Sequence, residues 1–169
     1  MKKIIFLALL TLNMHANTIE KSGDALLLIV PSLAFGSTLY LDDKEGQIQL
    51  VKSAFSNAVV TYGLKYSINK TRPNGENDRS FPSGHTSATF QGASFIHRRY
   101  GLSYGLLAYA GAIYTGYTRV HADKHYVEDV LAGALVGVLS TYAFTSASKI
   151  HFEPFFEGNR YGIGISKSW

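Results

Sequence analysis

The sequence has no cysteine, and it has no dense run of lysine and arginine. The absence of cysteine excludes a disulfide framework and a thiolate metal site. The formal net charge of +4 is modest and includes Lys2 and Lys3 at the start of the chain. We therefore expect no nucleic-acid partner. The sequence also has no internal repeat and no low-complexity segment, and its 169 residues predict a single domain.

The first residues have the pattern of a secretion signal. Lys2 and Lys3 precede the apolar run Ile4–Leu12, and Met14-His15-Ala16 ends in a small residue, as a cleavage site does. The apolar run is short for a membrane-spanning helix, although an uncleaved anchor is the alternative. We expect residues 1–16 to be a signal peptide. In a bacterium such a signal directs the chain to the periplasmic side of the cell envelope.

Apolar spacing and polar breaks predict an all-α chain, a compact bundle of about five helices after the signal. The predicted helices are Ala25–Leu41, Gln47–Asn69, Ser83–Tyr100, Leu102–Tyr117 and Tyr126–Ser146. Together they make a domain over residues 17–148, followed by a tail over residues 149–169.

The segments between and around these helices are more polar. Asn17–Asp24 predicts a loose lead-in, and Arg119–His125 predicts a short connector. The tail alternates aromatic, glycine and charged residues, and we expect a short strand there or no regular structure. Gly133 and Gly137 give the last helix a small-residue face for close packing.

Three segments carry no charge over about the length of a thin membrane span. They are Ala25–Leu41, Leu102–Thr118 and Val130–Ser148. The mean hydropathy of the chain is nevertheless only +0.03. Glycine, alanine, serine, threonine and tyrosine dominate these runs, and such residues suit tight helix contacts as well as lipid. We favour association with the inner membrane, with a soluble periplasmic bundle as the alternative.

Three polar clusters at the ends of the predicted helices hold the candidate site residues. They supply fixed cations, an anion-binding backbone turn, two histidines and one carboxylate: Lys65, Arg72, Ser83, Gly84, His85, Arg119, His125 and Asp129. Pro82 is suited to the first turn of a helix, where free N–H groups attract phosphate. Arginines can each bind two phosphate oxygens. This inventory suits phosphoryl transfer, in which positioning and charge neutralisation do most of the work.

The spacing of the histidines and the carboxylate assigns their roles. His125 and Asp129 are four residues apart, so Asp129 could accept from one ring nitrogen and leave the other as a nucleophile. His85 could protonate the leaving oxygen. His125 must then start neutral and His85 protonated. Nearby arginines lower the pKa of His125 and Asp129 raises it, and the sequence leaves the balance open.

These residues carry a resemblance to a known family. Lys65-x6-Arg72-Pro73, Pro82-Ser83-Gly84-His85 and Arg119-x5-His125-x3-Asp129 resemble the three signature motifs of the type 2 phosphatidic acid phosphatase (PAP2) family. That family includes class A acid phosphatases and vanadium-dependent haloperoxidases. One departure is Thr118, where the family usually has serine, and the hydroxyl is kept.

The resemblance implies a helical bundle with the site at one end. It implies a phosphohistidine at His125, oriented by Asp129, with His85 as general acid and then as base. The phosphate would be held by Lys65, Arg72, Ser83, Gly84 and Arg119, without a metal ion or another cofactor. His121 and Asp123 form a His-x-Asp-x-His string with His125, but the phosphatase motif accounts for that spacing better than a metal site does. Lys70, Arg79 and Lys124 are expected to be solvated loop charges.

The expected function is hydrolysis of a phosphomonoester or pyrophosphate. A lipid substrate, such as a phosphatidate, a polyprenyl pyrophosphate or lipid A, suits a bundle in a membrane. A small organic phosphate suits a soluble periplasmic acid phosphatase. The alternatives are a lipid phosphotransferase on the same site, a vanadate haloperoxidase, and a non-catalytic envelope protein that binds anionic lipid.

Overall fold

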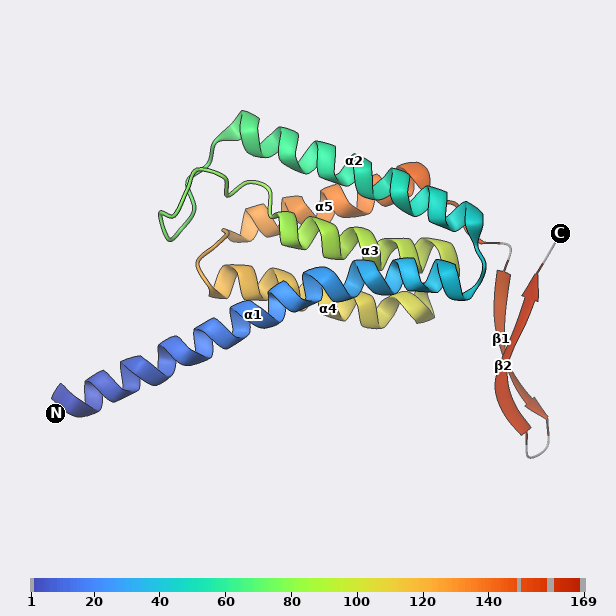
Figure 1. The fold of residues 1–169 in the computed structure, drawn as a ribbon, viewed down its shortest axis with the longest axis horizontal. Coiled ribbons are helices and arrows are strands. Elements are labelled where there is room, and N and C mark those ends of the chain that lie inside the picture. Colours follow the sequence, from blue (N-terminus) through green and yellow to red (C-terminus); the bar gives the residue numbers. More distant parts are fainter. Residues whose placement is uncertain (1, 149, 158–159, 168–169) are drawn as a thin grey trace.

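The computed structural model describes the backbone of residues 2–148, 150–157 and 160–167, and side chains from Thr18 to Ser148. A bundle of helices is followed by a two-stranded antiparallel hairpin (Figure 1). The helices are α1 (Lys2–Tyr40), α2 (Lys44–Ile68), α3 (Gly84–Tyr100), α4 (Leu102–His121) and α5 (Val127–Phe144), and the strands are β1 (Ile150–Glu157) and β2 (Arg160–Lys167). The predicted helical bundle is confirmed, and the tail pairs two strands where at most one was expected.

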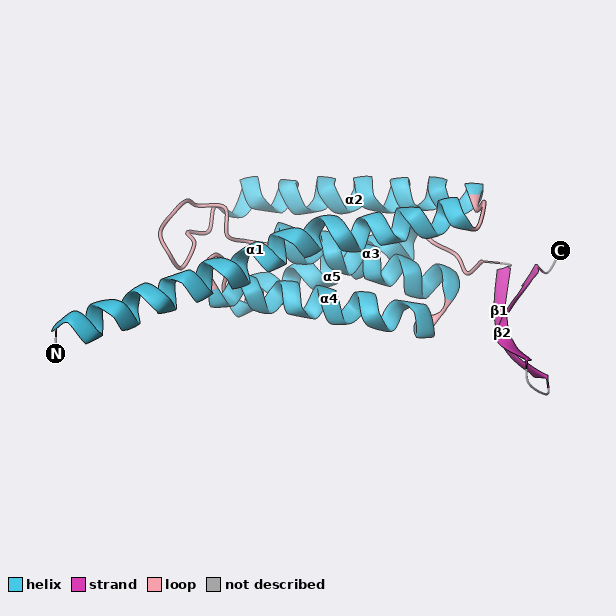
Figure 2. Ribbon diagram, turned by 60° about the horizontal axis from the view of Figure 1, so that its bottom comes forward, coloured by secondary structure: helices cyan, strands magenta, loops and turns pink. Residues whose placement is uncertain are grey.

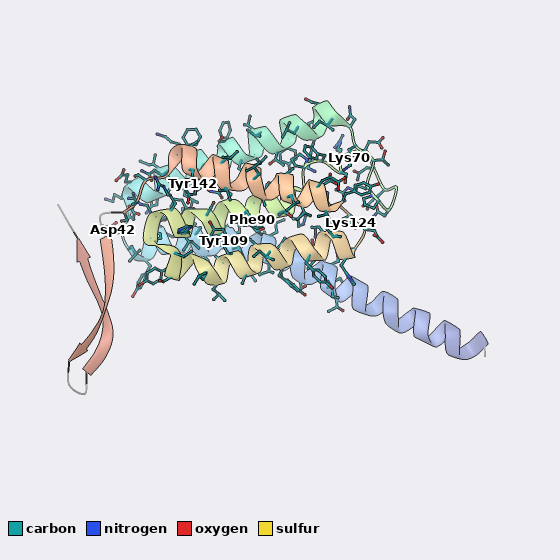
Figure 3. The ribbon with its side chains drawn as sticks, turned by 180° about the vertical axis from the view of Figure 1, so that it is seen from behind. Asp42, Lys70, Phe90, Tyr109, Lys124 and Tyr142 are labelled. Atoms are coloured by element: carbon teal, nitrogen blue, oxygen red, sulfur yellow. The ribbon has the colours of Figure 1, made fainter. Side chains whose placement is uncertain are left out.

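The connections of the bundle bring the polar clusters to one end. The central helix α3 packs against each of the other four helices. The loop between α2 and α3 and the connector between α4 and α5 lie at the same end, while the α1–α2 and α3–α4 turns lie at the other (Figures 1 and 2). Lys70 and Lys124 mark the first end and Asp42 marks the second (Figure 3). The three motif clusters therefore meet although they are distant in sequence.

Several helix boundaries differ from the prediction. The predicted lead-in Asn17–Asp24 is wrong, because α1 runs through it without a break. Arg119 lies in the last turn of α4 rather than in a connector. Ser83 is the N-cap of α3, so Pro82 precedes the cap instead of entering the first turn. Side chains before Thr18 lie outside the described part, and cleavage of residues 1–16 stays a prediction.

The glycines of α5 pack as predicted. A Cβ atom on Gly133 would lie 2.5 Å from the Ser83 carbonyl oxygen, and one on Gly137 would overlap the Ser87 carbonyl. Any side chain at these two positions would therefore push α5 away from α3. The two glycines hold the start of α5, which carries Asp129, against the start of α3, which carries His85.

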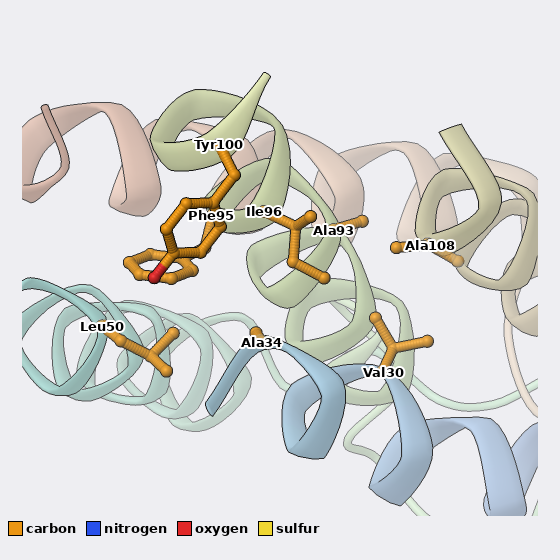
Figure 4. Close-up of a cluster of buried hydrophobic side chains, with 9 residues drawn as sticks. Val30, Ala34, Leu50, Ala93, Phe95, Ile96, Tyr100 and Ala108 are labelled. Carbon is orange, nitrogen blue, oxygen red and sulfur yellow. The ribbon is translucent and has the colours of Figure 1, made fainter. Parts of the chain in front are cut away.

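The interior of the bundle is small and the exterior is apolar. Among the side chains that the structure describes, nine form the hydrophobic core (Figure 4): Val30, Ala34, Leu50, Ala93, Phe95, Ile96, Tyr100, Ala108 and Ala112. Many other buried side chains are polar, whereas large hydrophobic side chains point outward, including Leu28, Leu33, Phe55, Val59, Leu107, Ile113, Leu131, Leu135 and Leu139. Thr18–Tyr40 and Val127–Phe144 are long and apolar enough to cross a membrane. An exposed apolar surface of this extent is that of a membrane-associated protein.

An ion pair closes the bundle at the end opposite the polar clusters. Arg99 donates to both carboxylate oxygens of Asp43, at 2.6 and 2.7 Å, and the Tyr100 hydroxyl donates to the same carboxylate at 2.9 Å. Burial alone would raise the pKa of Asp43, but the hydrogen bonds from Arg99, the Gly46 N–H and Tyr100 lower it on balance. Asp43 therefore stays ionised and ties the α1–α2 turn to the end of α3.

Removal of this arginine should destabilise the bundle strongly. Arg99→Ala leaves the Asp43 carboxylate buried without its main partner, a loss of about 3–5 kcal/mol in the free energy of unfolding. Denaturant unfolding of the full chain in detergent measures it. The matched control is Arg98→Ala, because Arg98 is exposed at the adjacent position. Equal effects of the two substitutions would contradict the assignment.

Candidate active site

Two cavities meet at the end of the bundle that carries the polar clusters. The larger, about 530 Å³, lies between α1, α2 and α3, and its walls include Leu27, Pro31, Ala54, Ala58 and Ala88. The smaller, about 290 Å³, is polar and its walls include Glu20, Asp24, Arg119 and Lys124. Four residues line both cavities: Arg72, Asn77, His85 and His125. Both predicted catalytic histidines therefore lie where an apolar groove joins a polar chamber.

His125 is held by a serine that the motifs did not single out. Its side chain is only 3% exposed, and its Nδ1 atom lies 3.5 Å from the Ser80 hydroxyl. That hydroxyl donates a short hydrogen bond to Asp129 Oδ2, so its oxygen lone pairs face Nδ1. Asp129 Oδ2 itself is 3.8 Å from Nδ1, beyond hydrogen-bond distance. Ser80 thus bridges the pair that we expected to be in direct contact.

The electrostatic surroundings keep His125 neutral. Burial lowers its pKa from 6.5 to about 3, helped by the positive charges of Lys65 and Arg72 and opposed by Asp129 and the Ser80 backbone. The sequence left open whether the cations or Asp129 would determine the pKa of His125. In the structure, burial and the cations outweigh Asp129. With a proton on Nδ1 facing Ser80, the lone pair is on Nε2, which makes a neutral nucleophile.

Asp129 is fully buried, and its charge is compensated by three donors. Lys70 Nζ donates to Oδ1 at 2.7 Å, and the Tyr126 N–H and the Ser80 hydroxyl donate to Oδ2. Lys70 also pairs with Glu128 at 2.7 Å and lies over the Tyr126 ring. Burial opposes the charged ammonium, but the hydrogen bonds that Lys70 donates to Asp129 and Glu128 raise its pKa on balance. The expectation that Lys70 is a solvated loop charge was wrong.

The three predicted phosphate-binding cations reach the site from three elements. Lys65, on α2, donates to the Arg79 carbonyl at 2.8 Å and lines the larger cavity. Arg72, on the loop, has a buried Nε atom without a partner. Arg119, on α4, donates from Nε to the Thr118 hydroxyl at 3.2 Å. The hydroxyl of Thr118 therefore supports the guanidinium, and the departure from serine keeps that contact.

His85 is bound by a carboxylate from α1. Its Nε2 atom lies 3.0 Å from Asp24 Oδ1, and the same oxygen accepts from Arg119 Nη1 at 2.8 Å. Burial and then the Arg119 charge lower the pKa of His85, against the opposing effect of Asp24. A bound phosphate dianion would favour the protonated form that the acid role requires. Asp24 belongs to the segment that the sequence predicted as an irregular lead-in.

The remaining motif residues divide between lining and support. Gly84 lines the larger cavity, and a Cβ atom there would make ordinary contacts with Lys65 and Thr61. The Ser83 side chain is fully buried and accepts from the Thr86 hydroxyl at 2.9 Å, and Ser83 lines neither cavity. The structure thus brings together Lys65, Arg72, Gly84, His85, Arg119 and His125, with Asp129 and Ser83 behind them.

The string His121-Asp123-His125 does not converge. His121 is exposed and stacks on the Tyr117 ring, whereas His125 is buried. Over the described residues, no group of three or more histidine, aspartate or glutamate side chains is arranged to hold a metal ion. The site is built instead from cations and a histidine that can bind and attack a phosphoryl group.

Comparisons with known proteins identify the family of the chain. The family model described as PAP2 superfamily matches residues 47–152. The lipid A 4'-phosphatase of Helicobacter pylori strain J99 is 30% identical over 177 residues, covering 94% of this chain and 89% of that protein. The lipid A 1-phosphatase of Porphyromonas gingivalis is 41% identical over 78 residues, which span 44% of this chain but only 18% of that protein. The crystal structure of Aquifex aeolicus LpxE has a TM-score of 0.57 and 26% identity, covering 71% of this chain and 83% of that one.

The bridge through Ser80 predicts a specific loss of activity. Ser80→Ala removes the hydroxyl between His125 and Asp129, so the imidazole loses its orientation and turnover should fall about 10–100-fold. Ser80→Thr keeps the hydroxyl and should retain most of the turnover. Steady-state phosphate release, with circular dichroism to check the fold, measures both. Unchanged turnover in Ser80→Ala would show that the Ser80 hydroxyl does not orient His125.

The low pKa of His125 predicts how the chain responds to acid. Its ring should stay neutral from pH 8 to pH 5, and Lys65→Met should move the titration upward because a nearby positive charge is lost. Because the folded-state pKa is depressed, the stability that neutral His125 contributes is complete above pH 6.5 and is lost as the pH falls toward about 3. NMR of ¹⁵N-labelled histidine measures the titration. A His125 midpoint near 6.5 in the unsubstituted chain would contradict the assignment.

Proposed function

Because the chain belongs to the PAP2 superfamily and is a phosphatase of that type, we propose that it removes a phosphate group from a membrane lipid, with lipid A as the first candidate. The observation that carries the proposal is the position of Arg72, His85 and His125 where the two cavities join. A phosphorylated lipid has the matching shape, because its phosphate suits the polar chamber and its chain suits the apolar groove. The lipid A phosphatase relatives support the same class of substrate.

The proposed first step transfers the phosphoryl group to His125. Nε2 attacks phosphorus, the bond from phosphorus to the lipid oxygen breaks, and His85 gives its proton to that oxygen. Arg72, Arg119 and Lys65 neutralise the charge on the other phosphate oxygens. Ser80 and Asp129 hold the ring while it gains positive charge.

The proposed second step releases phosphate. Neutral His85 takes a proton from water, the water oxygen bonds to phosphorus, and the bond from phosphorus to Nε2 breaks. His85 is then protonated again and His125 is neutral again, so the cycle closes without another reactant. The proposed steps use only these residues and water.

We also propose that the site opens on the periplasmic side of the inner membrane. The proposal rests on the predicted signal peptide over residues 1–16 and on the apolar exterior of the bundle. The catalytic domain then spans residues 17–148, with the hairpin at the opposite end from the site (Figure 1).

Purified full chain in detergent, with EDTA, should release phosphate from lipid A faster than from a soluble aryl phosphate. The rate with a short-chain phosphatidate, measured in the same assay, shows whether lipid A is preferred over another phosphorylated lipid. His125→Ala should lower the rate at least about a thousandfold, because the nucleophile is lost. The matched control is His121→Ala, since His121 is exposed and outside the site. Release unaffected by His125→Ala would refute the mechanism, and release from the aryl phosphate alone would refute the lipid substrate.

A further inference from the structure

The carboxylate of Asp24, a residue outside the signature motifs, contacts two groups of the site that are expected to bind an anion. Its Oδ1 atom accepts from His85 Nε2 at 3.0 Å and from Arg119 Nη1 at 2.8 Å. A single oxygen thereby contacts two groups that a substrate phosphate needs. Asp24 lies on α1, and the family match begins only at residue 47, so the motifs assign it no role.

Each of the three guanidinium nitrogens of Arg119 donates a hydrogen bond in this arrangement. Nε donates to the Thr118 hydroxyl, Nη2 donates to the Glu20 carbonyl, and Nη1 donates to Asp24. The Asp24 side chain is 49% exposed, whereas the Arg119 side chain is 4% exposed. Of these three contacts, the one with Asp24 is therefore the one that an incoming anion can replace without unpacking the helices.

Close packing fixes Asp24 in this position. The preceding residue is Gly23, and a Cβ atom there would lie 2.7 Å from Arg119 Nη2 and would overlap the Thr118 hydroxyl. The glycine lets α1 approach α4 closely enough for the Asp24 carboxylate to reach Arg119. The contact is thus part of how α1 packs and not a chance meeting of surface charges.

We propose that Asp24 is a specificity-determining residue that acts as an internal, displaceable anion. It holds His85 and Arg119 until a substrate binds, and an incoming phosphate must replace it. The cost of replacing it weakens the binding of every anion. Phosphodiesters, which carry a single charge and abound in bilayers, are then kept out, while a phosphomonoester with nearly two charges still binds. The role in substrate choice rests on the proposed function.

The test compares Asp24→Asn with Glu20→Gln in the full chain in detergent. Both substitutions remove one negative charge from α1 at the smaller cavity, but the Glu20 side chain pairs with Lys124 at 3.5 Å and not with His85 or Arg119. Calorimetry with inorganic phosphate should show binding about tenfold tighter in Asp24→Asn, because one charge-assisted contact no longer competes. Glu20→Gln should change the affinity by about twofold at most. Diethyl phosphate should inhibit Asp24→Asn and leave the unsubstituted chain active.

Several outcomes would overturn the proposal. One is an affinity for inorganic phosphate that is unchanged or weaker in Asp24→Asn. Another is an affinity that increases equally in Asp24→Asn and Glu20→Gln. A fall in kcat with unchanged phosphate affinity would mean that Asp24 positions His85 instead of competing with substrate. Phosphate binding needs no turnover, so the result stands apart from lipid hydrolysis: failure to hydrolyse any lipid would refute the proposed function while the affinity comparison still decides the role of Asp24.

Discussion

The catalytic end depends on the compensation of one buried charge, the carboxylate of Asp129. A buried carboxylate stays ionised only when its oxygens accept hydrogen bonds from nearby donors. Lys70 and Ser80 come from the loop between α2 and α3, and the Tyr126 N–H comes from the start of α5. Compensating this charge therefore fixes the loop on the bundle, and it places Ser80 against His125. The loop that carries Arg72 is ordered for the same reason.

The bundle has a polar interior and an apolar exterior, and both properties serve the site. Serine, threonine, asparagine and glutamine side chains line the seam between α2 and α3, where Thr61, Ser87 and Gln91 hydrogen-bond within the interior. On the other side of α3, Gly133 and Gly137 let α5 pack directly against the α3 backbone. The outward leucine, isoleucine and valine side chains suit lipid. Such an exterior is compatible with the lipid substrate that we propose.

The sequence predicted the parts of the site whose positions follow from motif spacing. His85, His125 and the three cations are brought together because each lies at a helix end or in a connection between helices, and the alternating helix directions place these positions at one end of the bundle. Ser80 and Lys70 could not be found in this way, since a loop has no periodicity that shows which side chains point inward. Asp24 was missed because its polar segment was taken as irregular, whereas the segment is helical and the Asp24 side chain contacts Arg119. Low mean hydropathy weakened the membrane prediction because it averages a polar interior with an apolar exterior.

The central claim is that Nε2 of His125 becomes bonded to phosphorus during turnover. The most direct measurement is rapid mixing of the enzyme with ³²P-labelled lipid substrate, an alkaline quench that preserves phosphohistidine, and mass spectrometry of the peptide that contains His125. The account predicts label on His125 that appears at early times and is lost as phosphate is released. Turnover with label on another residue, or with no label at early times, would contradict it.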